Sequence, residues 1–96
     1  MSTQLLAPAL YIDLPPQQKL ALIAIADNAT PDGEATINHE RLAARLYAGA
    51  TRQEAVELVE QLESAGYLTR APELDDLFDR ESFGFMVTIP ERGTEA

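Results

Sequence analysis

The sequence predicts one α+β domain in which three helices pack with a small antiparallel β-sheet. Two observations predict this class. Between residues 16 and 65, three segments have the apolar spacing of helices and are separated by turn signals. After residue 66, two short segments are rich in aromatic and β-branched residues, as strands are. The 96 residues have room for a single core of modest size.

The first helix is expected from Pro16 to about Ala29. An extended run over residues 10–14 leads into Pro15-Pro16, and proline is compatible with the first turn of a helix but not with its interior. The middle of this helix is apolar on almost every side, which predicts burial from several directions. Turn residues over Thr30-Pro31-Asp32-Gly33 end it.

A brief strand over Ala35–Ile37 and a second helix over His39–Leu46 follow. Asn38 is a good N-cap for this helix, whose leucines and alanine form one buried face. Residues 47–50 form the next turn, where Gly49 can adopt a positive φ without steric cost.

The third helix is expected from Arg52 to Ala65. Thr51 caps it, and Glu54 stands three residues later, as a capping box requires. Apolar residues repeat at helical spacing along one side, and Gly66 ends the helix as the residue after its C-cap.

Two strands close the domain, over residues 67–70 and 83–89. Their connection, Ala71–Ser82, is too long for a tight hairpin and is interpreted as a wing. We expect a short helical turn in this wing that folds back on the core through Leu74, Leu77 and Phe78.

The domain organisation follows from these elements. Residues 1–14 are expected to form an extended N-terminal arm, residues 15–90 the domain, and residues 91–96 a flexible tail. The absence of cysteine excludes disulfides and is compatible with a cytoplasmic protein. No apolar run approaches the roughly 20 residues that span a membrane, so no membrane association is expected.

The order of helix, strand, helix, turn, helix, strand, wing and strand resembles the small winged helix-turn-helix proteins of bacteria, plasmids and phages. These include replication-associated and MarR-like regulatory proteins. The resemblance implies a DNA-binding protein that inserts its third helix into the major groove. It rests on residues 25–29, 32–34, 37, 42–46, 51–52, 62–63 and 66–68.

The resemblance also implies a set of DNA contacts on double-stranded DNA. Phosphate contacts are expected from the start of the third helix and from four arginines, Arg41, Arg45, Arg52 and Arg70. Base reading is expected from Arg52, Gln53 and Glu57. The predicted DNA-binding residues are Arg41, Arg45, Thr51, Arg52, Gln53, Glu57 and Arg70.

The charge of the chain opposes DNA binding. The net charge is −9, the third helix carries one base against four acids, and the wing carries one base against five. Related proteins often carry basic residues at positions 56, 57, 60 and 61, which hold Val, Glu, Glu and Gln here. The alternative is therefore an acidic protein-interaction module, or a DNA mimic, that binds a basic protein partner. Its predicted contacts are Val56, Glu57, Glu60, Asp75, Asp76 and Asp79.

The sequence contains little that predicts an enzyme. Its only histidine, His39, is interpreted as a solvent-facing residue at a helix start. No metal-ligand spacing or glycine-rich phosphate loop is present, so we expect a non-enzymatic protein without metal or cofactor. A homodimer is also expected, because the apolar stretch of residues 5–14 can pair with a second copy as well as pack on its own domain.

Overall fold

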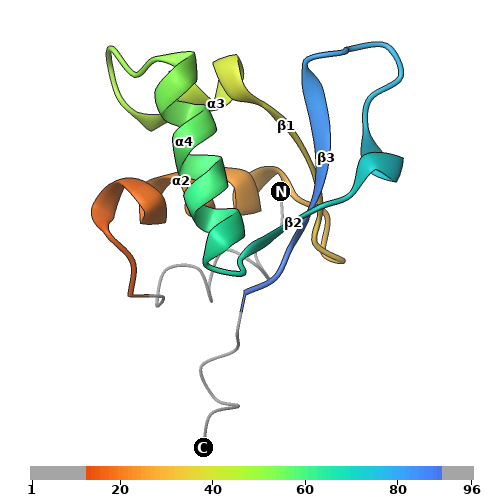
Figure 1. The fold of residues 1–96 in the computed structure, drawn as a ribbon, viewed down its shortest axis with the longest axis horizontal. Helices are drawn as coiled ribbons and strands as arrows, with labels where there is room; N and C mark the ends of the chain where they lie inside the picture. The colour runs from red at the N-terminus through yellow and green to blue at the C-terminus, as the bar shows by residue number, and fades with distance from the viewer. Residues whose placement is uncertain (1–12, 90–96) are drawn as a thin grey trace, which may run out of the picture.

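The structure is a computed structural model that describes residues 13–89. In this part of the chain, three helices and a three-stranded antiparallel sheet form an α+β fold with the layout of a winged helix-turn-helix (Figure 1). The predicted arm, apart from its last two residues, and the predicted tail lie outside the described residues. The elements are α2 (Pro16–Asn28), β1 (Glu34–Asn38), α3 (His39–Leu46), α4 (Arg52–Ser64), β2 (Leu68–Arg70), η1 (Pro72–Leu74) and β3 (Ser82–Val87).

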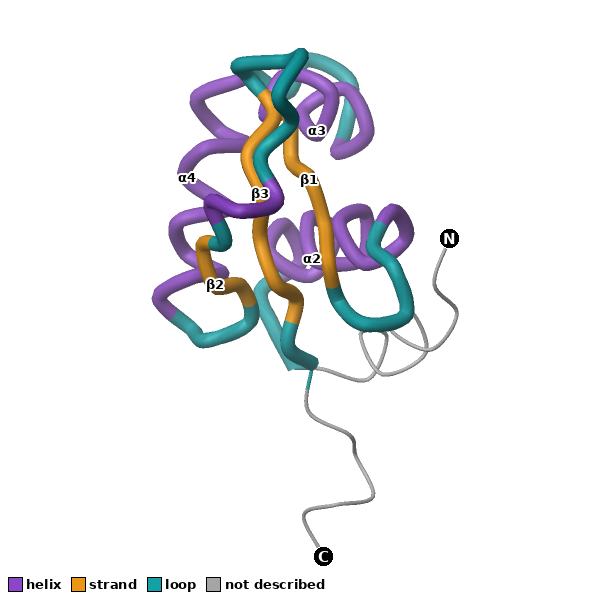
Figure 2. The backbone as a smooth tube through the Cα atoms, turned by 90° about the vertical axis from the view of Figure 1, so that its right-hand side faces the viewer, coloured by secondary structure: helices purple, strands orange, loops and turns teal. Residues whose placement is uncertain are grey.

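The sheet has β3 at its centre, antiparallel to both β1 and β2. Ala35 lies opposite Phe85, and Leu68 lies opposite Val87. Because side chains alternate between the two faces of a sheet, these four residues share one face, and all four are buried. Figure 2 shows the sheet in front of α2, α3 and α4, so this is the face that the helices cover.

The helix α2 confirms the expected burial from several directions. Leu22 is fully buried, and Ile25 and three alanines are buried with it, whereas Leu20 is 39% exposed. The helix ends one residue earlier than predicted, and the following turn contains Gly33 at a φ of +92°. A side chain at Gly33 would also collide with the backbone of Val87. Glycine is therefore required there both by the positive φ and by the lack of space for a Cβ.

One apolar cluster forms the core of the described residues, with contributions from all three helices and all three strands. Its largest fully buried side chains are Leu22, Val59 and Leu62. Because α4 supplies two of these three, its inner face is fixed against α2 and the sheet, and its outer face is left to solvent.

The wing, Ala71–Ser82, packs part of its length onto β3. A Cβ built at Gly84 would overlap the Ala71 carbonyl oxygen and the Leu74 side chain, so the absence of a side chain lets η1 lie against the strand. Leu74 is half-buried there, as expected. The prediction that Leu77 and Phe78 fold back on the core is wrong, because they are 91% and 98% exposed.

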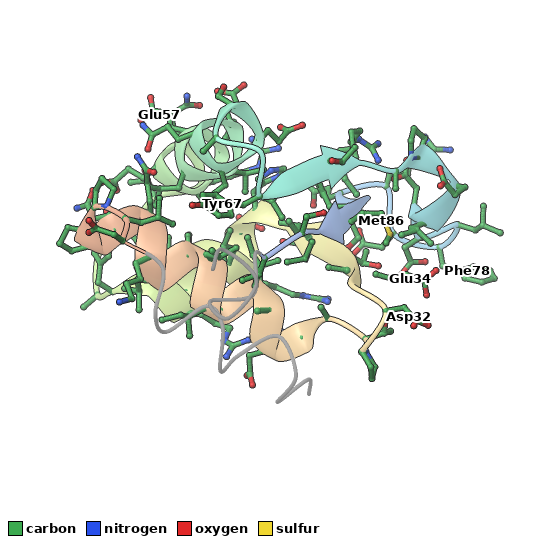
Figure 3. All side chains as sticks on the ribbon, turned by 90° about the horizontal axis from the view of Figure 1, so that it is seen from below. Asp32, Glu34, Glu57, Tyr67, Phe78 and Met86 are labelled. Carbon is green, nitrogen blue, oxygen red and sulfur yellow. The ribbon has the colours of Figure 1, made fainter. Side chains whose placement is uncertain are left out.

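Local hydrogen bonds explain this difference. The Phe78 amide donates to the Asp76 carboxylate (2.8 Å), and the Ser82 hydroxyl donates to Asp79 (2.6 Å). Asp79 also accepts from the Glu81 amide (3.0 Å). These local bonds of Asp76 and Asp79 fix the course of the loop, and they direct Leu77 and Phe78 outward. Figure 3 shows Phe78 pointing away from the body of the molecule.

Candidate functional site

The helices α3 and α4 meet at a tight corner. Gly49 has a φ of +86°, and the Ala50 amide donates to the Tyr47 carbonyl oxygen (3.1 Å). The Thr51 hydroxyl accepts from the Glu54 amide (3.1 Å), and the Glu54 carboxylate accepts from the Thr51 amide (2.9 Å). The predicted capping box is therefore confirmed, and it fixes where α4 begins.

The same capping box places a negative charge at the start of α4. The Tyr47 hydroxyl also donates to Glu54 (2.8 Å). The bond from the Thr51 amide, with that from Tyr47, lowers the pKa of Glu54, so its carboxylate stays ionised near neutral pH. A helix N-terminus ordinarily attracts phosphate, but here a carboxylate of the chain already lies at that position.

Five of the predicted DNA contacts are exposed. Arg41 lies near the start of α3, and the other four lie at the start of α4 and in its first turns: Thr51, Arg52, Gln53 and Glu57. Arg41 and Arg52 form no ion pair with any residue from 13 to 89. They are thus the two arginines of the predicted set whose charge is available to a ligand.

Arg45, the third predicted phosphate contact, joins α3 to α2. Its guanidinium forms an ion pair with Asp27 (2.9 Å) and donates to the Ala24 carbonyl oxygen (3.4 Å). Its charge is therefore offset within the fold, although 42% of its side chain remains exposed.

Arg70, the fourth, holds the wing against the sheet. Its guanidinium makes two hydrogen bonds to the Asp75 carboxylate (2.7 and 2.9 Å) and a third to the Gly84 carbonyl oxygen (2.9 Å). It also lies over the rings of Phe83 and Phe85, 5.2 and 5.5 Å from their centroids. The bonds from Arg70, and then that from the Gly84 amide, lower the pKa of Asp75 to about 2. The two residues act as one structural clamp.

The solvent side of α4, here called the α4 outer face, comprises Gln53, Glu57, Glu60, Gln61 and Ser64, all exposed. Gln53 donates a long hydrogen bond to Glu57 (3.4 Å), one turn away. Gln61 accepts from Gln18 of α2 (3.0 Å), at one edge of the face. Val56 is half-buried at the flank. The α4 outer face therefore presents two carboxylates and no base.

The wing carboxylates of the alternative set act within their own loop. Asp75 is part of the clamp, and Asp76 accepts from the Phe78 amide (2.8 Å). Asp79 accepts from the Ser82 hydroxyl (2.6 Å) and the Glu81 amide (3.0 Å), and these bonds lower its pKa. The lowered pKa values of Asp75 and Asp79 keep these two carboxylates ionised near neutral pH while they shape the wing.

His39 differs from its predicted role. It is half-buried, its ring lies 5.8 Å from that of Phe83, and its Nδ1 is buried without a hydrogen-bond partner among the described residues. Burial, followed by the nearby positive charge of Arg52, lowers its pKa, so the ring is neutral near pH 7. The prediction of a solvent-facing histidine is wrong. The ring lies against Phe83, which belongs to a strand far along the chain, so the residues next to His39 in the sequence did not indicate this burial.

Two features escaped the reasoning from sequence. One is the exposed pair Leu77-Phe78. Aspartates favour local turns, so Asp76 and Asp79 on either side of the pair could have indicated that it lies in a turn. The other is a pocket of about 360 Å³ between α2, β1 and α3, whose walls come from four separate parts of the chain. No local pattern could have predicted the pocket.

Within residues 13–89, no three His, Asp or Glu side chains lie close enough together to hold a metal ion. None of the described helices is long and apolar enough to cross a membrane. No protein family, curated protein or solved structure matches the chain. Function is therefore inferred from the surface chemistry described above.

Proposed function

We propose that the α4 outer face docks a basic protein partner, and that the chain is a non-enzymatic interaction module with a winged-helix layout. One observation carries the proposal. Glu57 and Glu60 project from this face, and neither forms an ion pair with any residue from 13 to 89. They are one turn apart on the helix, so a basic segment can approach both at once.

The distribution of charge favours a protein partner over DNA. Of the four predicted phosphate contacts, Arg45 and Arg70 are engaged inside the fold. The remaining two would neutralise about two phosphates. The slope of the logarithm of the binding constant against the logarithm of salt concentration would then be roughly −0.9 times two. The wing that would flank a duplex adds four net negative charges. A polyanion is therefore repelled over most of the surface it would have to cover.

The partner expected on these grounds is a lysine- or arginine-rich protein segment. Complementary charge would steer its approach, although exposed ion pairs add only about 0–1 kcal/mol each to affinity. Val56, half-buried beside the acids, supplies an apolar contact at the edge of the same face.

DNA binding is the second candidate. The observation that favours it is the exposure of Arg41 on α3 and of Thr51, Arg52 and Gln53 at the start of α4. Such a contact would be small and salt-sensitive. It would suit the regulatory or replication-associated role that the winged helix-turn-helix resemblance implies.

Charge reversal on the α4 outer face distinguishes the two candidates. The double substitution Glu57→Lys and Glu60→Lys should abolish binding of a fluorescent lysine-rich peptide and create affinity for mixed duplex DNA. Both are measured by fluorescence anisotropy from about 20 mM salt, where screening is weak, up to physiological salt. The control, Glu34→Lys with Glu73→Lys, changes net charge equally at exposed sites outside α4 and should retain most peptide binding.

If DNA is the true ligand, the measurements on the wild-type chain contradict the protein-docking proposal. That chain would then bind the duplex at about 20 mM salt, and Arg52→Ala would weaken that binding. Peptide binding that is equally weak in the double variant and in its control would remove the protein-docking proposal.

A further inference from the structure

We propose that two copies of this chain associate by exchanging wing tips, each tip entering a pocket of the other copy. The wing tip is Leu77 and Phe78. The pocket is the 360 Å³ hollow between α2, β1 and α3. This contact is separate from the α4 outer face, since Figure 3 shows Phe78 and Glu57 projecting at opposite sides of the molecule.

The wing tip has the character of a contact residue pair. Leu77 and Phe78 are adjacent, 91% and 98% exposed, and are two of the three large apolar side chains that the described residues leave exposed. Hydrogen bonds from Phe78 to Asp76 and from Ser82 to Asp79 already order the loop. Little conformational entropy would thus be lost when the tip is buried, which favours binding.

The pocket is large enough for an aromatic side chain. Ala24, Ile25, Ile37 and Leu42 supply its apolar lining, and a cavity of about 150 Å³ is enough to hold benzene. Its polar residues are Asn28, Thr36, Asn38, Arg41, Arg45, Asp76 and Ser82.

The local charge at the pocket, in contrast to the net charge of the chain, favours the wing of a second copy as its occupant. The wing around the tip is net negative by four, and Arg41, at the pocket, forms no ion pair with any residue from 13 to 89. The carboxylates that surround an entering tip would therefore meet the Arg41 guanidinium, whose charge otherwise acts at longer range on Asp79 of its own wing. A basic partner would bring a cation to Arg41 instead.

The positions of tip and pocket allow both contacts at once. Asp76, two residues before Phe78, lines the pocket of its own chain, yet Phe78 itself is 98% exposed and so does not fill it. Tip and pocket are thus neighbours on one surface. A two-fold axis close to Asp76 would place each tip in the other copy's pocket, as a self-complementary dimer interface requires.

Sedimentation velocity from about 1 μM to about 1 mM at physiological salt tests the association. We expect a concentration-dependent dimer that Phe78→Ser abolishes. Asn28→Trp, at an exposed helix end that lines the pocket, should abolish it by filling the pocket. Leu20→Ser removes an exposed leucine from α2 outside the pocket and should leave the dimer intact. A wild-type chain that is monomeric throughout would overturn the proposal.

Disulfide trapping identifies the occupant, because the chain contains no natural cysteine. Under mild oxidation, a mixture of Leu77→Cys and Thr36→Cys chains should give a crosslinked dimer, since Thr36 is exposed at the pocket. A mixture of Leu77→Cys and Leu20→Cys chains should not. If a disulfide forms between Thr36→Cys and Leu6→Cys, and none forms between Thr36→Cys and Leu77→Cys, the occupant of the pocket is the N-terminal segment. That result would refute the wing-tip exchange.

Discussion

At the scale of single residues, the contact between Arg70 and Asp75 determines how the wing sits on the sheet. Arg70 binds both oxygens of the carboxylate, and the Gly84 amide donates to one of them (2.7 Å). A bidentate arginine–carboxylate pair has more directional geometry than a lysine could provide. One ion pair therefore links the end of β2, the wing and the middle of β3.

The Asp75 clamp predicts a specific sensitivity to acid. Its pKa is lowered from 3.8 to about 2 in the fold, so ionised Asp75 stabilises the folded state above pH 4. That contribution is lost as the pH falls from about 4 to about 2. Thermal melts should therefore show a decline in Tm over this range, and Asp75→Asn should lower Tm at pH 7 and flatten the decline.

Asp32→Asn serves as the control, since Asp32 is an exposed turn residue without an ion pair among the described residues. It should leave the melting profile close to that of the wild type. Equal acid profiles for Asp75→Asn and the wild type would show that Asp75 is not a source of the acid response.

At the scale of elements, the wing depends on the close approach of η1 to β3. Gly84 has no side chain, and its carbonyl oxygen accepts from the Ala71 amide (2.9 Å) and from Arg70. The wing therefore approaches β3 most closely at Gly84, where the strand has no Cβ. This contact fixes the base of the loop that carries Leu77 and Phe78.

Gly84→Ala should destabilise the domain by about 1–3 kcal/mol, because the added methyl group must displace η1 or bend β3. Urea unfolding followed by circular dichroism measures the change. Thr88→Ala, at an exposed position just beyond β3, should stay within about 0.5 kcal/mol of the wild type. An unchanged stability for Gly84→Ala would mean that the contact between η1 and β3 is loose.

At the scale of the whole molecule, the net charge of −9 is the dominant electrostatic feature. Few of the carboxylates are paired, because the described residues form only two ion pairs, Arg45–Asp27 and Arg70–Asp75. Mutual repulsion among surface carboxylates therefore opposes the compact state and the association of two copies.

This repulsion predicts that salt stabilises the fold. Raising sodium chloride from about 20 mM to about 500 mM shortens the screening length from over 20 Å to a few ångströms and should raise Tm. Differential scanning calorimetry in chloride buffers measures the effect. A Tm that falls with salt would show that the two ion pairs contribute more to stability than the excess of acids costs.

The positions of the helices and strands were predictable from the sequence to within about two residues, and the reason is local chemistry. The two residues of the capping box, Thr51 and Glu54, are three positions apart. Just beyond the end of α4, the amides of Gly66 and Tyr67 donate to carbonyl oxygens of its last turn. Turn, cap and periodic apolar residues act on near neighbours, so their pattern along the chain is enough to place each element.

The availability of the site residues was decided only by tertiary structure. Asp27, which pairs with Arg45, stands 18 residues before it, and Phe83, which covers His39, belongs to a strand far along the chain. The pocket combines residues from α2, β1, α3 and the wing. Whether a charged side chain is unpaired, or an apolar side chain is buried, depends on such distant neighbours. The spacing of residues along the sequence does not indicate which distant residues will be in contact.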